Sequence, residues 1–179
     1  MTVEQIITGC INKNRGAQKE LFYSYSKSLM ATAFRYTRDE FAAKDVVQES
    51  FIKIYKSINQ LKTHHEGTLI SWMKKITARQ ALRYLEQRKS FQSRQTTSRS
   101  HTVESTANMQ MADVMKALEM LPEGYRNVFQ LNVIEGYSHK EIGSMLQIEP
   151  STSRSQLTRA RSMFYEKWSE LENYYGNVK

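Results

Sequence analysis

The chain has 179 residues, 40% of them hydrophobic, and a formal net charge of +8, which excludes wholesale disorder and favours a polyanionic partner. Only two Pro and seven Gly occur, and no alternating apolar run is long enough to demand a sheet, so an all-α fold is expected. A single cysteine, no apolar run of about 18 residues and no signal-peptide pattern exclude a disulfide framework, a membrane span and secretion, and predict a cytoplasmic protein.

The first half of the chain has four helical patterns and most of the positive charge. Apolar residues recur at helical spacing in four stretches, residues 2–12, 17–37, 40–58 and 68–89. Asp39 stands where it can cap the third of these helices. Residues 1–89 contain 16 Lys and Arg against 8 Asp and Glu. This excess suits binding to a polyanion in general.

Two of these helices have a face that the residues leave open to two interpretations. On the third helix the partly exposed face comprises Asp45, Gln48, Glu49 and Ile52. Such a face can dock a protein or simply be solvated, and composition alone favours the solvated surface. On the fourth helix Trp72 stands among cations such as Lys75 and Arg79. Trp72 can stack on single-stranded bases whose phosphates the cations neutralise, or it can be a core residue.

Residues 90–108 are predicted to be a flexible linker between two small helical domains, residues 1–89 and 109–179. Ser and Thr dominate this stretch, large apolar residues are sparse and no helical stripe survives. In the second domain, a helix that begins at about Met109 should stop before Pro122, and residues 125–134 should form another.

The stretch from Glu135 to Phe164 predicts a helix–turn–helix. Ser138 and Glu141 have the spacing of a capping box, Gly143 allows a second helix to approach closely, and Pro150 suits the start of that helix. Its inward stripe comprises Leu157, Ala160 and Phe164, and its outward stripe comprises Ser151, Arg154, Ser155, Thr158 and Ser162, flanked by Arg159. A buried seam with an outward face of hydrogen-bond donors is what DNA reading needs, and the alternative is an ordinary amphipathic hairpin.

Nothing in the sequence points to catalysis, a metal or a cofactor. It contains no Gly-rich phosphate loop, no paired catalytic carboxylates and no nucleophile elbow. His64, His65 and Glu66 are adjacent and do not converge on one ion. We therefore expect no enzyme, no cofactor and no metal site.

Three stretches, in order, resemble the extracytoplasmic-function sigma factors, the compact group of bacterial RNA polymerase sigma subunits. The polymerase-docking helix of that family is similar to AAKDVVQESFIKIYKSI, and its minus-ten helix is similar to SWMKKITARQALRYLEQRK. The domain that reads the minus-thirty-five element is similar to LPEGYRNVFQLNVIEGYSHKEIGSMLQIEPSTSRSQLTRARSMF. The resemblance spans about residues 15–165. It implies promoter recognition and strand opening as a subunit of RNA polymerase, with an anti-sigma protein as a further partner.

The resemblance also implies roles for individual residues. Contact with the polymerase clamp helices is implied for Asp45, Gln48, Glu49 and Ile52. A place near the melted minus-ten strand is implied for Lys62, Trp72, Lys75 and Arg79, with the loop from Lys62 to Gly67 holding a flipped-out base. Entry into the major groove is implied for Ser151, Thr152, Arg154 and Ser155, and phosphate contact for Arg159 and Arg161.

The chain departs from the family pattern at four positions. Arg79 and Arg83 stand where Asn and Asp are common, which favours phosphate binding over base reading there. Gln147 replaces a usual Gly in the turn, so the backbone must avoid a positive φ or adopt it at some cost. Ser153 replaces a usual apolar anchor and should weaken the packing of the recognition helix.

The predicted linker limits how far the two domains can act apart. Its residues span at most about 63 Å when extended and average about 24 Å as a flexible coil. Two promoter elements about 25 base pairs apart are separated by about 85 Å. Domain radii of about 13 Å close only part of this gap. We expect the linker to follow a track on polymerase and the free protein to bind promoter DNA poorly. The alternatives from other classes are a stand-alone helix–turn–helix transcriptional regulator and a helical protein-interaction adaptor.

Overall fold

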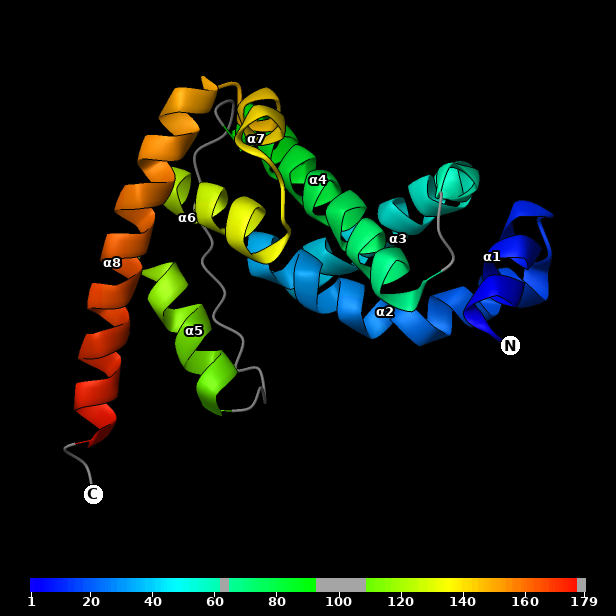
Figure 1. The fold of residues 1–179 in the computed structure, drawn as a ribbon, viewed down its shortest axis with the longest axis horizontal. Coiled ribbons are helices and arrows are strands. Elements are labelled where there is room, and N and C mark those ends of the chain that lie inside the picture. The colour runs from blue at the N-terminus through cyan, green and yellow to red at the C-terminus, as the bar shows by residue number, and fades with distance from the viewer. Residues whose placement is uncertain (62–64, 93–108, 177–179) are drawn as a thin grey trace. The chain divides into compact units, whose positions relative to one another are not determined.

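The computed structural model describes residues 1–61, 65–92 and 109–176, and every regular element in these ranges is helical (Figure 1). The chain divides into two compact units, Met1–Val103 and Glu104–Lys179. The predicted all-α fold with two small helical domains is confirmed for this part of the chain. Each unit is built around its own core.

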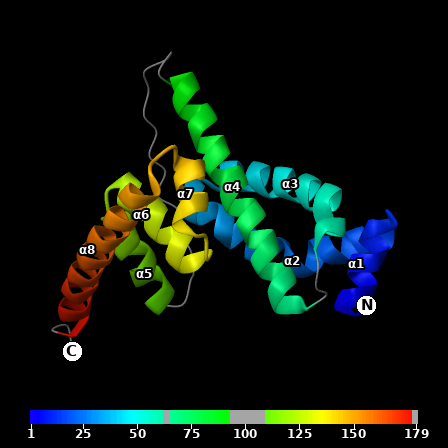
Figure 2. The ribbon, with the colours of Figure 1, turned by 45° about the horizontal axis from the view of Figure 1, so that its top comes forward.

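The first unit is a bundle in which three long helices pack pairwise. Its elements are α1 (Val3–Ile11), α2 (Arg15–Thr37), α3 (Glu40–Ser57), the short 3₁₀ turn η1 (Ile58–Gln60) and α4 (Glu66–Gln92). Figures 1 and 2 show α2, α3 and α4 side by side, with α1 at one end of α2. Their fully buried side chains include Leu21, Leu29, Ile54, Leu69 and Met73. Burial of such side chains, each worth about 1.5–3 kcal/mol, drives the packing.

Side-chain caps fix where these helices begin. Thr2 and Gln5 form a capping box at α1, and Asn14 Oδ1 accepts a hydrogen bond from a backbone N–H in the first turn of α2. Asp39 caps α3 as predicted, because its Oδ1 accepts from the backbone N–H of Ala42 at 2.8 Å. Caps of this kind are worth about 1 kcal/mol each. The Asp39 cap fixes the residue at which α3 begins.

A polar contact and a buried thiol lie where α1, the start of α2 and the end of α3 come together. Tyr55 Oη donates to the backbone oxygen of Gln18 at 2.9 Å. Burial, followed by the nearby Cys10, raises the pKa of Tyr55 to about 12. Burial alone raises the pKa of the Cys10 thiol to about 11. Both groups therefore remain protonated at neutral pH.

The second unit contains α5 (Met109–Glu119), α6 (Glu123–Phe129), a π-helical segment η2 (Gln130–Ile134), α7 (His139–Leu146) and α8 (Pro150–Gly176). Helices α5, α6 and α7 all pack against α8. The rings of Phe129 and Phe164 stack with their centroids 5.0 Å apart, and Trp168 stacks on Phe164 at 6.1 Å. Three other helices and an aromatic stack of the second unit therefore pack on the long α8.

Helix α4 is longer than the sequence predicted, and α8 extends past the helix–turn–helix. Helix α4 continues to Gln92, three residues into the predicted linker, and α8 continues to Gly176. Neither extension contains a proline or an internal glycine, the residues that most strongly break a helix.

Candidate functional site

The helix–turn–helix begins with the predicted capping box. Ser138 Oγ accepts from the backbone N–H of Glu141 at 3.3 Å, and the Glu141 carboxylate accepts from the backbone N–H of Ser138 at 2.8 Å. Both hydrogen bonds satisfy donors that the first turn of α7 leaves unpaired. The box fixes the start of α7, which carries the buried Ile142 against the rest of the unit.

The turn between α7 and α8 uses a strained residue and a close backbone approach. Gln147 adopts φ +54°, in the left-handed region that glycine prefers, and its Nε2 donates to the backbone oxygen of Ser144 at 2.9 Å. The side chain thus offsets part of the cost of replacing glycine. At Gly143, a Cβ atom would lie 2.6 Å from the backbone oxygen of Ile148. Only glycine lets the turn fold back this closely over α7.

Helix α8 presents the predicted outward face to solvent. Pro150 is its first residue, and Leu157 and Ala160 are buried in its seam. The exposed residues on the opposite side include Ser151, Arg154, Ser155, Thr158, Arg159, Arg161 and Ser162, whereas Thr152 is half-buried. This face has no acidic residue, so it can approach phosphates without repulsion.

The hydroxyl and guanidinium groups on this face differ in how many of their hydrogen-bond donors are already used within the chain. Ser155 Oγ donates to the backbone oxygen of Thr152 at 3.0 Å, and Thr158 Oγ1 donates to that of Arg154 at 3.2 Å. These two hydroxyls therefore offer DNA mainly their acceptor lone pairs. Arg159 Nη1 donates to Tyr125 Oη at 3.4 Å, and this hydrogen bond raises the pKa of Arg159. The exposed arginines therefore supply most of the hydrogen-bond donors that this face of α8 still offers.

Ser153 has a partner that the sequence analysis did not anticipate. Its side chain is fully buried, and its Oγ lies 2.9 Å from Nδ1 of His139 on α7. A buried hydroxyl without a partner would cost about 1–3 kcal/mol, so this pair offsets much of the loss of an apolar anchor. The signal in the sequence was a polar residue at an inward position, which requires a partner somewhere.

Three of the four residues predicted to lie near melted DNA are on α4. Trp72 and Lys75 are half-buried and Arg79 is exposed. Part of the Trp72 side chain is therefore packed, as expected of a core residue, and part is accessible, as stacking on a base requires. The fourth, Lys62, lies outside the described residues, as does His64. Among the residues that are described, no group of three His, Cys, Asp or Glu side chains could hold a metal ion.

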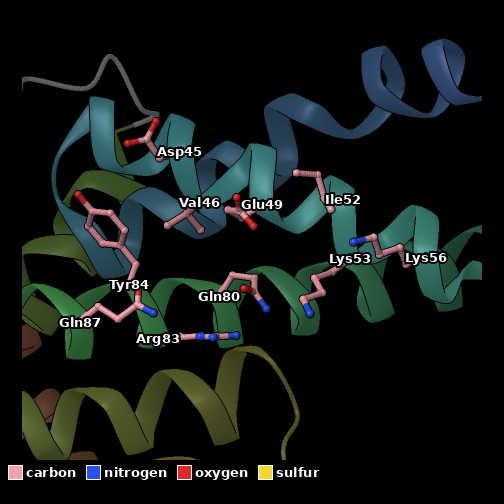
Figure 3. A pocket seen from close by; sticks show the side chains of 10 residues that line it. All are labelled: Asp45, Val46, Glu49, Ile52, Lys53, Lys56, Gln80, Arg83, Tyr84 and Gln87. Carbon is pink, nitrogen blue, oxygen red and sulfur yellow. The ribbon is translucent and has the colours of Figure 1, made fainter.

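The docking face predicted on α3 is exposed and adjoins a groove. Asp45, Gln48 and Glu49 are exposed, and Ile52 is 45% exposed. The groove has a volume of about 420 Å³ and lies between α3 and α4, with Asp45, Glu49 and Ile52 on one wall and Arg83 on the other (Figure 3). Both helices therefore contribute to one surface of the first unit.

Comparisons with known proteins cover both units of the chain. The family model for sigma-70 region 2 matches residues 21–91, and the model for sigma-70 region 4 matches residues 111–164. No helix among the described residues is long and apolar enough to cross a membrane.

Similar proteins are found among curated sequences and solved structures. The ECF RNA polymerase sigma factor SigE of Mycolicibacterium smegmatis is 28% identical over 79% of this chain and 58% of its own length, so the chain spans little more than half of that relative. The RNA polymerase sigma-H factor of Pseudomonas aeruginosa is 24% identical over 88% of this chain and 89% of its own length. The sigma factor RpoE of Bartonella quintana, solved in complex with the anti-sigma factor NepR, has the same fold, with a TM-score of 0.59 at 19% identity over 84% of this chain and 96% of that one.

Proposed function

The chain belongs to the sigma-70 family, in its extracytoplasmic-function group, and we propose that it directs core RNA polymerase to specific promoters and helps to open them. The observation that carries this proposal is that one chain contains both region 2 and region 4, in that order. A stand-alone helix–turn–helix regulator has no need of region 2. As an initiation factor it catalyses no reaction itself, and it works where polymerase is, in the cytoplasm.

Region 2 supplies docking and strand capture in this proposal. The exposed face of α3 binds the clamp helices of the polymerase through Asp45, Gln48, Glu49 and Ile52. On α4, Trp72, Lys75 and Arg79 lie along the melted non-template strand, with Lys62 in the preceding loop. Stacking and phosphate neutralisation would offset the few kcal/mol that each unstacked step costs.

Region 4 supplies the duplex reader. Ser151, Thr152, Arg154 and Ser155, in the first turns of α8, enter the major groove of the minus-thirty-five element. Arg154 is the residue best suited to read a guanine, because a guanidinium can donate two hydrogen bonds to one base. Arg159 and Arg161 lie farther along the helix and contact phosphates.

An anti-sigma protein is a further proposed partner. Two solved structures with this fold each contain a second protein: the sigma factor RpoE is in complex with the anti-sigma factor NepR, and CnrH is in complex with the cytosolic domain of CnrY. A partner of this kind would cover the docking faces and keep the chain from polymerase. Co-purification of the chain from its own cells would identify that partner.

Run-off transcription tests the proposed function. The full chain is added to sigma-free bacterial core polymerase with a library of upstream genomic fragments, and specific transcripts are expected. Arg154→Ala should lower transcription from a selected promoter about 5- to 150-fold, the equivalent of one lost bidentate base contact of about 1–3 kcal/mol. Arg15→Ala removes an exposed arginine outside both predicted interfaces and should leave transcription unchanged. No transcript from any fragment, together with no binding to core, rejects the proposal.

A further inference from the structure

The groove between α3 and α4 contains charges of both signs. Asp45 and Glu49 contribute carboxylates from α3, and Lys53 and Lys56 contribute ammonium groups from the same helix (Figure 3). The α4 wall contributes the guanidinium of Arg83. The predicted docking residues are therefore only one side of a larger charged surface.

Arg83 stands at the border between two faces of α4. Successive residues of an α-helix are rotated by about 100°, so Arg83 lies about 40° from Arg79 around the axis, on the side of Gln80 and Gln87. Gln80, Arg83 and Gln87 all line the groove, whereas Arg79 does not. The packing of α4 on α3 thus separates two arginines that the sequence had assigned to the same DNA phosphates.

The charges of the groove are available to a partner. Within the described part of the chain, Asp45, Glu49, Lys53 and Arg83 form no ion pair with one another or with other residues. All four are exposed, so their charges are satisfied by water while the chain is free. A partner with charges in the reverse order could replace that water without leaving a charge unpaired.

We propose that Arg83 belongs to the polymerase-docking surface and binds an acidic side chain of the core polymerase segment that lies along the α3–α4 groove. Basic side chains of the same segment meet Asp45 and Glu49. This inference rests on the proposed function, because its occupant is core polymerase. Two observations support that occupant: the groove is lined by Asp45, Glu49 and Ile52 of the proposed docking face, and its charges are of both signs. At about 420 Å³ the groove has room for a few side chains and not for a whole helix.

The proposal separates the roles of two neighbouring arginines. Arg83 contributes to assembly with core, whereas Arg79 contributes to promoter opening. Both are exposed and both are on α4, so Arg79→Glu is a matched control for Arg83→Glu. Each substitution changes the charge by the same amount and alters no buried contact.

Equilibrium binding of the labelled full chain to sigma-free core, measured by fluorescence anisotropy, tests the inference. Arg83→Glu should weaken core binding at least 10-fold, and Arg79→Glu should change it less than 2-fold. Opening of a selected promoter, followed by permanganate reactivity of unpaired thymines at saturating core, should decrease with Arg79→Glu. Circular dichroism and thermal unfolding of each variant check that both still fold as the wild type does.

Two results would overturn the inference. Equal loss of core binding in both variants would show a general effect of charge, and loss of opening without loss of core binding in Arg83→Glu would make Arg83 a DNA contact. Glu49→Lys separates this failure from failure of the proposed function. If Glu49→Lys weakens core binding and Arg83→Glu does not, only the role of Arg83 is wrong. If neither does, docking through α3 is wrong as well.

Discussion

Replacing Gly143 by alanine should damage the helix–turn–helix, the proposed DNA reader, by pushing its turn away from α7. The new Cβ would lie 2.6 Å from the backbone oxygen of Ile148 and 3.4 Å from the backbone nitrogen of Pro150. That oxygen lies in a segment that is tied to α7, because the backbone N–H of Ile148 donates to the oxygen of Gly143 at 3.0 Å. The clash therefore moves the turn and the first residues of α8 together.

Two opposing effects set the magnitude. Forcing one extra carbon into a tightly packed place costs about 1–3 kcal/mol. Alanine in the interior of a helix gains about 1 kcal/mol over glycine, which offsets part of that cost. The net expectation for Gly143→Ala is a loss of up to about 2 kcal/mol, or about 30-fold in the unfolding equilibrium. Displacement of the recognition helix should add a loss of promoter-specific transcription.

Gly124→Ala is the matched control within the same unit. A Cβ at Gly124 would meet only the Gln156 side chain, at 3.9 Å, so this substitution should be neutral or stabilising. Urea unfolding of the two full-length variants, monitored by tryptophan fluorescence in a Trp72→Phe background, follows the second unit through Trp168. Equal stability of Gly143→Ala and Gly124→Ala would refute the close approach at the turn.

Two further predictions concern polar and buried groups. A double-mutant cycle with Ser153→Ala and His139→Ala should give a coupling of about 0.5–1.5 kcal/mol in unfolding, because the two side chains share one hydrogen bond; additive losses would show that they do not interact. Cys10 should resist a thiol reagent at pH 8 until the chain unfolds, because burial raises its pKa to about 11. Since the folded pKa lies above the ordinary thiol pKa of 9.0, the stability from this group is present below about pH 9 and is lost as the pH rises through 11. Rapid labelling of the folded chain at pH 8, or stability unchanged across that range, would contradict the burial of the thiol.

The features that the sequence predicted well are local ones. The capping box of Ser138 and Glu141, the Asp39 cap and the first position of Pro150 each depend on residues within one helical turn. Short-range spacing determines such contacts, so they can be identified before any packing is known. The all-α fold could be predicted because caps and apolar stripes indicated helices in both domains.

What could not be predicted depends on packing between segments. His139 and Ser153 are 14 residues apart, and their pairing needs the geometry of the turn between them. Arg83 and Arg79 look equivalent on α4, and only the position of α3 shows that one of them lines a groove. Helical periodicity predicts on which face of a helix a residue lies. An arginine at the border of two faces can reach the surface on either side, because its side chain is long.

The most direct test of the account compares promoter binding by the chain alone and by the chain with core polymerase, at the same physiological salt concentration. A chain that reads two promoter elements through two separate units, one of them held by polymerase, should protect both elements only when core is present. The chain alone should show weak binding that does not distinguish promoter from control DNA and that falls steeply with salt. Tight, promoter-specific protection of a palindromic site by the chain alone would contradict the account and identify a stand-alone regulator instead.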